Sequence, residues 1–190
     1  MTPFLTILAC TLISGAALAA TPAPSYTQAA TGNSLQFTFT QLDAANTGKF
    51  TKFATTLVYD DKNLSASSLN VKVDVTSLDT SDGERDDALK SEDLFNAAKF
   101  PAATFSAPAL SRNAAGGLVA AGKLTLRGVT KPLTLPLTLK PTTTGLELSG
   151  EVSIKRLEFG VGQGEWKSTE SVGDEVKIQY KVALVKAAAK

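Results

Sequence analysis

The side chains best suited to chemistry are carboxylates gathered in one polar stretch, namely Glu84, Asp86, Asp87, Glu92 and Asp93. Two carboxylates held a short distance apart can act as acid and base in glycoside hydrolysis. Arg85 and Lys90 lie in the same stretch, and such mixed charge is typical of a solvated surface and of helix ends. A carboxylate-dependent hydrolase is therefore one hypothesis, and a polar surface connection is the simpler one.

Histidine and cysteine, which many catalytic and metal sites need, are absent from most of the chain. The sequence has no histidine, and its one cysteine, Cys10, lies in an apolar N-terminal segment. A Ser-His-Asp triad and the usual zinc site are therefore excluded. Gly160-Val-Gly-Gln-Gly164 lacks the Lys-Ser/Thr that completes a phosphate-binding loop. We expect no catalytic residue, no metal site and no cofactor, apart from any lipid that the protein binds.

Composition limits the classes of partner. The 190 residues include 19 basic and 18 acidic side chains, so the net charge of +1 leaves no basic footprint for nucleic acid. Hydrophobic residues make up 43% of the chain, which argues against disorder. A chain of this length favours one domain with a sizeable core. The sequence leaves the oligomeric state open.

The N-terminus has the pattern of an export signal. Residues 1–19 carry no charge, contain an apolar run from Phe4 to Ile13 and end in Ala17-Leu-Ala19, a small-x-small cleavage pattern. We expect a cleaved signal peptide over 1–19, a single domain over 20–190 and a location in the periplasm. The export compartment is oxidising, but the mature chain would have no cysteine and would depend on packing.

Alternation of apolar and polar residues runs through most of the remaining chain. The clearest case is Gly122 to Leu139, where leucines at every second position predict two strands joined by a turn over Arg127 to Pro132. Similar alternation covers 35–40, 53–59, 69–75, 104–107, 146–154 and 176–184. About eight such strands predict an all-β fold, and closure into an antiparallel barrel would remove the exposed edges.

Three local features interrupt this alternation. Asn46-Thr-Gly48 predicts a turn after the first strand. Between Ser81 and Lys99, acidic residues precede short apolar runs, which predicts short helices in this one connection. Pro136 cannot donate a backbone hydrogen bond, so its position favours an edge, a bulge or a barrel bend.

The inward positions of these strands define a candidate apolar interior. Its expected lining residues are Phe37, Phe39, Leu57, Tyr59, Val71, Val73, Phe105, Leu124, Leu126, Leu135, Leu137, Ile154, Phe159, Trp166, Ile178 and Tyr180. An eight-stranded barrel can be filled by its own side chains or can hold one small ligand. The pattern alone leaves both interpretations open.

Four segments in the same order resemble the YceI-like family of exported bacterial lipid-binding proteins. They are Arg85 to Asn96 with the following Lys99-Phe-Pro101 and Thr104-Phe-Ser106, Gly122 to Pro132, Arg156-Leu-Glu-Phe-Gly-Val161, and Val172 to Ile178. Several positions depart from the family pattern, including Asn96 and the missing His-Ser pair around Asn33-Ser34, and these departures leave the details of the ligand head group open. Ala88 stands where the family commonly has histidine, and Glu158 stands where it usually has aspartate.

The resemblance implies a lipocalin-like barrel in the periplasm that holds an isoprenoid lipid, such as a prenyl quinone or a polyprenyl phosphate, without catalysis. It also implies a possible partner in the membrane, such as a b-type cytochrome or another envelope protein. Arginine suits bidentate contacts to an anionic or carbonyl head group, so Arg85, Arg127 and Arg156 are the head-group candidates. Surface ion pairs with neighbouring carboxylates are the alternative role for these arginines. The alternative for the whole protein is a filled core that acts through its surface on an envelope partner.

Overall fold

The computed structural model describes residues 23–187, so the expected signal peptide lies outside the described residues. Its strands are β1 (Ser25–Gln28), β2 (Ser34–Gln41), β3 (Ala44–Phe50), β4 (Phe53–Val58), β5 (Ser68–Asp74), β6 (Leu78–Asp79), β7 (Ala102–Ala107), β8 (Ser111–Arg112), β9 (Leu118–Leu126), β10 (Val129–Pro141), β11 (Gly145–Lys155) and β12 (Val172–Lys186). The helices are α1 (Gly83–Lys90) and the 3-10 helices η1 (Leu64–Ala66), η2 (Val75–Ser77), η3 (Arg156–Phe159) and η4 (Gly164–Lys167). No helix within 23–187 combines the length and apolar character needed to cross a bilayer.

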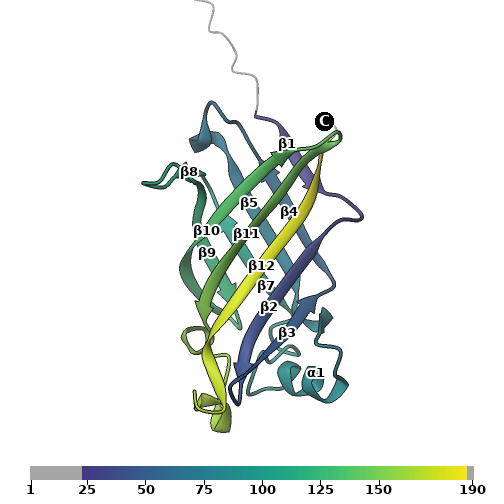
Figure 1. The fold of residues 1–190 in the computed structure, drawn as a ribbon, viewed down its shortest axis with the longest axis vertical. Coiled ribbons are helices and arrows are strands. Elements are labelled where there is room, and N and C mark those ends of the chain that lie inside the picture. The colour runs from purple at the N-terminus through teal and green to yellow at the C-terminus, as the bar shows by residue number, and fades with distance from the viewer. Residues whose placement is uncertain (1–22, 188–190) are drawn as a thin grey trace, which may run out of the picture.

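The strands form a closed antiparallel barrel, which confirms the predicted fold class. The ring runs through β1, β4, β5, β7, β9, β10, β11 and β12, and it closes because β1 pairs with both β4 and β12. At the other end of the barrel β2 continues beside β12, β3 pairs with β2, and β6 pairs with β3. Figure 1 shows β1 and the C-terminus at one end of the barrel and α1 at the other.

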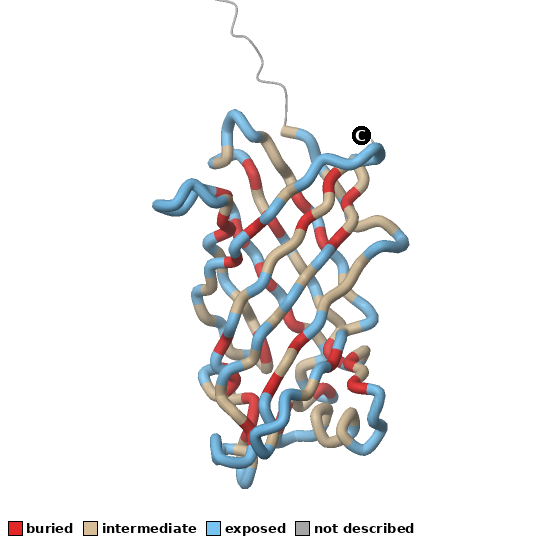
Figure 2. Tube along the Cα trace, in the orientation of Figure 1, coloured by how far each residue is buried: buried red, intermediate tan, exposed pale blue. Residues whose placement is uncertain are grey.

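The alternation in the sequence matches the two faces of the long strands. In β10, Leu135 and Leu137 are buried while Thr134 and Pro136 are exposed. Buried and exposed positions alternate along the strands in Figure 2 as well. The turn between β9 and β10 is shorter than the sequence indicated. It consists of Arg127 and Gly128 alone, both with positive φ (50° and 76°), and pairing resumes at once between Leu126 and Val129.

The turn predicted at Asn46 to Gly48 is wrong, because these residues lie inside β3. The β2–β3 turn is formed by Leu42 and Asp43, both with positive φ. Gly48 has a packing role instead: a Cβ atom there would collide with the ring of Phe37 on β2. Gly48 is therefore not part of a turn. It leaves room for the ring of Phe37, which lies across β3 at this position.

A similar arrangement shapes the contact between β10 and β11. Among the described residues, the paired positions of these strands run from Pro141 with Leu146 to Thr138 with Ser149 and stop short of Pro136. Pro136 has no N–H to continue the ladder. Its carbonyl accepts a hydrogen bond from the Tyr180 hydroxyl of β12, and a Cβ on Gly150 would collide with both groups. Gly150 thus leaves the space through which Tyr180 reaches across β11.

The connection from β6 to β7 covers the barrel end opposite β1. Asp82 caps α1 by accepting a hydrogen bond from the Arg85 backbone N–H (3.1 Å). One α-helix forms in this connection, and residues 91–99 continue as turns. The backbone carbonyl of Asp93 accepts hydrogen bonds from the N–H groups of Gly162 (3.0 Å) and Gln163 (2.7 Å). These bonds join the connection to the loop between β11 and β12.

The Gly150 contact gives a stability prediction. Gly150→Val should lower the free energy of unfolding by about 2 kcal/mol, because the added side chain displaces Tyr180 or the Pro136 carbonyl. Ser153→Val is the matched control on the exposed face of the same strand, and it should change stability by less than about 0.5 kcal/mol. Urea unfolding of both variants measures the difference, and equal midpoints would contradict this role of Gly150.

Candidate functional site

The two halves of the barrel interior differ. Near β1 the inward side chains pack into a closed core, with Leu57, Leu69, Ala107, Ala120 and Leu184 almost fully buried. Toward α1 the interior contains a cavity of about 410 Å³ with mainly apolar walls. Packed residues such as Leu69, Leu135 and Val182 belong both to the core and to the cavity wall, so the core forms the inner end of the cavity.

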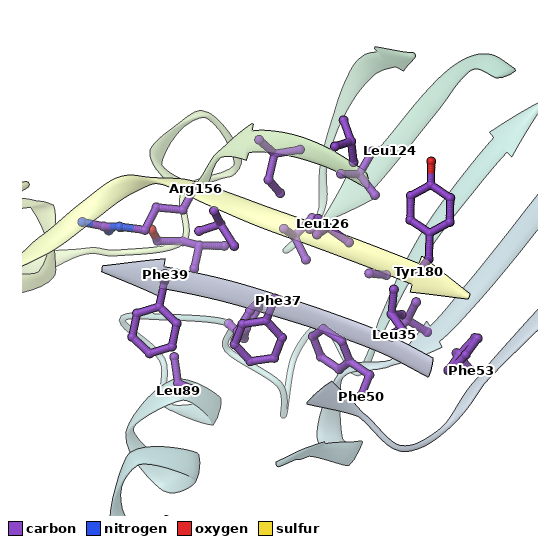
Figure 3. Close-up of a pocket in the computed structure, with 18 of the residues that line it drawn as sticks. Leu35, Phe37, Phe39, Phe50, Phe53, Leu89, Leu124, Leu126, Arg156 and Tyr180 are labelled. Atoms are coloured by element: carbon purple, nitrogen blue, oxygen red, sulfur yellow. The ribbon is translucent and has the colours of Figure 1, made fainter. Parts of the chain in front are cut away.

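Most of the residues expected to line the interior surround this cavity. They are Phe37, Phe39, Val71, Val73, Phe105, Leu124, Leu126, Leu135, Ile154, Trp166, Ile178 and Tyr180. Figure 3 shows several of them, with Arg156 and Phe39 at one end and Tyr180 and Phe53 at the other. Phe39 of β2 and Leu89 of α1 point toward one another. Their contact with a ligand stays a prediction.

Four expected lining residues are not among those around the cavity. Leu57 and Leu137 pack in the closed core, and Phe159 is buried in a cluster with Ile154 and Val161. Tyr59 donates a hydrogen bond to the Asp61 carboxylate (3.0 Å) at the β1 end. Leu57 and Leu137 share the inward alternation of the strands, but alternation gives only the face of a residue. Whether that stretch of the interior is packed or open depends on the facing strands.

The sequence pattern missed the residues that cover the cavity from outside the main ring. They come from α1 and the turns that follow it, namely Ala88, Leu89, Leu94 and Phe95, and from β3, where Phe50 lines the wall. Phe50 packs against Phe37 at 5.2 Å and Phe95 at 6.2 Å between ring centroids. The only sequence signal for this cover was an apolar run in a polar connection, which has no strand periodicity.

Arg156 is buried at the cavity wall, and its guanidinium is committed to the protein backbone. Its Nε donates to the carbonyl of Gly173 (2.9 Å), its Nη1 to those of Val161 (2.9 Å) and Trp166 (2.7 Å), and its Nη2 to those of Val172 (2.7 Å) and Ser168 (3.4 Å). Burial lowers the pKa of Arg156, and the Asp174 carboxylate opposes this effect. The side chain holds the β11–β12 loop against the barrel.

The other two head-group candidates lie in different surroundings. Arg85 lines the cavity near its outer end and forms an ion pair with Asp82 (3.4 Å between Nη2 and Oδ2). Arg127 does not line the cavity, and its Nη2 donates to the backbone carbonyl of Glu92 (2.7 Å). The structure therefore brings Arg85 and Arg156 to the cavity and uses Arg127 to tie the β9–β10 turn to the α1 connection.

The carboxylates that suggested hydrolysis have different surroundings. Glu84 lines the cavity together with Asp82, whereas Asp86 accepts hydrogen bonds from the Thr80 backbone N–H (2.8 Å) and hydroxyl (2.7 Å). Asp86 thus anchors α1 to Thr80, the residue that follows β6. The polar outer end of the cavity consists of Gln41, Asp82, Glu84 and Arg85, in which two carboxylates face one guanidinium.

A closed eight-stranded antiparallel barrel with a cavity at one end and a covering helix defines a small-ligand binding class of architecture. The YceI-like domain family matches residues 26–184. The chain belongs to this family, as the four sequence segments indicated.

Individual relatives agree with this assignment. The chain is 38% identical over 116 residues to a UPF0312 protein of Yersinia enterocolitica and, equally, to protein YceI of Escherichia coli. Each of these matches spans 57% of this chain and 60% of the relative. The solved structure of Burkholderia cenocepacia BcnA superposes with a TM-score of 0.75 at 31% identity, covering 79% of this chain and 94% of BcnA.

A more distant structure shares the fold. It is described as a polyisoprenoid binding domain from Saccharophagus degradans, and it matches with a TM-score of 0.66 at 15% identity. The match covers 86% of this chain and 99% of that domain. At this identity the likeness shows the barrel architecture.

The commitment of Arg156 gives a second prediction. Arg156→Met should destabilise the protein by about 3 kcal/mol or more, because several buried carbonyls lose their charged donor. Arg112→Met is the control, since Arg112 is half-exposed in its ion pair with Asp61 (3.3 Å) and should contribute less than about 1 kcal/mol. Equal unfolding midpoints for the two variants would show that the guanidinium does not hold the loop.

Proposed function

We propose that the protein holds an isoprenoid lipid with an uncharged head group, such as a prenyl quinone, inside its barrel. It acts as a carrier in the periplasm and catalyses no reaction. The observation that carries this proposal is the apolar cavity between the packed core and α1. Family membership supports it, as does the fold shared with a polyisoprenoid binding domain from another organism.

An unoccupied cavity is unfavourable for the protein, because about 410 Å³ of space with mainly apolar walls stays in contact with water when no ligand is bound. Its volume lies within the range of small-ligand sites, roughly 300–1,000 Å³. A bound apolar chain would remove most of this cost. The cavity argues against a filled-core protein that works only through its surface.

A carrier must also release its lipid. Forty buried carbons at ~0.8 kcal/mol each would nominally give ~30 kcal/mol relative to water, beyond the roughly −18 to −21 kcal/mol ceiling of non-covalent binding. The relevant alternative for an isoprenoid is a bilayer, which is about as apolar as walls of leucine, valine and phenylalanine. Transfer between the two is then close to balanced, as exchange with a membrane requires. A membrane b-type cytochrome or another envelope protein is the proposed recipient.

The charges around the cavity favour an uncharged head group over a phosphate. Arg156 donates to backbone carbonyls, and Arg85 is paired with Asp82. Glu84 adds a second carboxylate at the outer end. A polyprenyl phosphate would need unpaired cations there and would meet like charge. A quinone carbonyl requires only a hydrogen-bond donor.

Lipid uptake tests the proposal directly. The purified mature protein should take up a prenyl quinone from vesicles at least about tenfold more strongly than a polyprenyl phosphate of equal chain length. The absorbance of the quinone in the gel-filtered protein and mass spectrometry of solvent extracts measure the two ligands. Equal or preferred uptake of the phosphate would refute the head-group assignment, and uptake of neither would refute lipid binding.

Blocking the cavity provides a matched pair of variants. Leu124→Trp places a larger ring in the cavity and should reduce quinone uptake by about tenfold or more, because the chain loses the space it occupies. Lys123→Trp adds the same ring one residue earlier along β9, where the side chain is exposed, and should leave uptake unchanged. Unfolding midpoints check that both variants fold. Normal uptake by a folded Leu124→Trp protein would place the ligand elsewhere.

A further inference from the structure

A buried hydroxyl without a partner lies in the cavity wall. Thr55 of β4 is 2% exposed and lines the cavity, and its Oγ1 has no hydrogen-bond partner among the described residues. A buried polar group that lacks a partner is unfavourable, so native structures satisfy nearly all of them. Thr55 shares the inward face of β4 with Phe53 and Leu57. Its hydroxyl is therefore an exception that a ligand atom could satisfy.

The position of Thr55 is at the inner end of the cavity. Leu57, the next inward residue of β4, is fully buried in the closed core, and Phe53 lies in Figure 3 at the end remote from Arg156 and Leu89. Thr55 pairs across the sheet with Val71, which also lines the cavity. The hydroxyl is thus separated from the charged outer end formed by Asp82, Glu84 and Arg85.

A second orphan atom lies on the neighbouring strand. The last paired position of β1 with β4 is Thr27 opposite Thr56, and Gln28 and Thr55 are the residues that come next on the two strands. The Gln28 Oε1 atom is buried and has no partner among residues 23–187. Gln28 does not itself line the cavity. The Thr55 Oγ1 and Gln28 Oε1 atoms are thus two unsatisfied polar atoms on adjacent strands, beside an otherwise apolar interior.

The polar groups of Tyr180 and Arg156 in the cavity wall are already satisfied. The Tyr180 hydroxyl donates to the Pro136 carbonyl, and burial raises the pKa of this phenol. The nitrogens of Arg156 donate to carbonyls of the β11–β12 loop. Thr55 is consequently the donor that the wall leaves for a ligand at the inner end.

We propose that Thr55 is a specificity-determining residue whose hydroxyl donates a hydrogen bond to an uncharged oxygen of the lipid head group. This inference rests on the proposed function and adds the orientation of the ligand: the head lies at the inner end and the isoprenoid chain runs outward toward α1. In a bilayer the head group faces the aqueous side, so a lipid that leaves the membrane can enter the barrel head first. The apolar residues of the α1 connection, Leu89, Leu94 and Phe95, then cover the chain.

The chemistry selects a class of ligand. A carbonyl or hydroxyl oxygen can accept from Thr55, whereas a charged phosphate would be buried among apolar walls without a cation. A hydrocarbon of the same isoprenoid type would leave the hydroxyl unsatisfied. A site that supplies a buried polar group discriminates against analogues that lack the matching group.

The experiment compares two probes and three variants. Binding of a prenyl quinone and of squalene, an isoprenoid hydrocarbon, is measured for the wild type, Thr55→Val, Thr55→Ser and Thr56→Val. Thr55→Val should weaken quinone binding by about tenfold, which corresponds to ~1.4 kcal/mol, and should leave squalene binding unchanged or slightly stronger. Thr55→Ser keeps the hydroxyl and should retain the quinone preference. Thr56→Val carries the same change on the outer face and should bind as the wild type does.

The outcomes separate this inference from the proposed function. If the wild type binds quinone but Thr55→Val binds it equally well, or loses both probes alike, the Thr55 contact is refuted and lipid binding stands. If the wild type binds neither probe, the proposed function fails and this inference fails with it. Unfolding midpoints of lipid-free Thr55→Val should equal or exceed those of the wild type, because the orphan hydroxyl is gone. If Thr55→Val does not fold, Thr55→Ala takes its place as the variant without a hydroxyl. A Thr55→Ala protein that prefers quinone as strongly as Thr55→Ser does would also refute the contact.

Discussion

Closure of the sheet through β1 is the constraint on which the rest of the structure depends. Because β1 pairs with both β4 and β12, neither flank of the ring is left as an open edge at that end. Closure also turns one face of every long strand into a shared interior. This interior is packed at one end, around Leu57 and Leu184, and open at the other.

The open half persists because its polar groups are used to hold the shell. Arg156 binds the β11–β12 loop, Tyr180 satisfies the carbonyl of Pro136 where the ladder ends, and Asp86 anchors α1. Each of these bonds fixes backbone around the cavity without filling it. The same commitment removes these groups from ligand recognition, which leaves few polar atoms to define what the cavity accepts.

The barrel architecture could be predicted from the sequence, whereas the site could be predicted only in part. Alternation in segments such as Gly122 to Leu139 predicted strands with one inward face, and the structure bears this out. The same alternation could not separate Leu126, which lines the cavity, from Leu137, which packs in the closed core. Asn46 to Gly48 had the composition of a turn, yet tertiary packing against Phe37 uses Gly48 inside a strand.

By itself, the sequence determined the class of fold, the family and the absence of histidine, because periodicity, motif order and composition are local properties of the chain. Tertiary structure alone decided that the interior is half packed and half hollow, that Arg156 serves a loop, and that Thr55 keeps an unpartnered hydroxyl. These outcomes depend on which strands face one another across a closed sheet. Distances across the barrel have no counterpart in the spacing of residues along the chain.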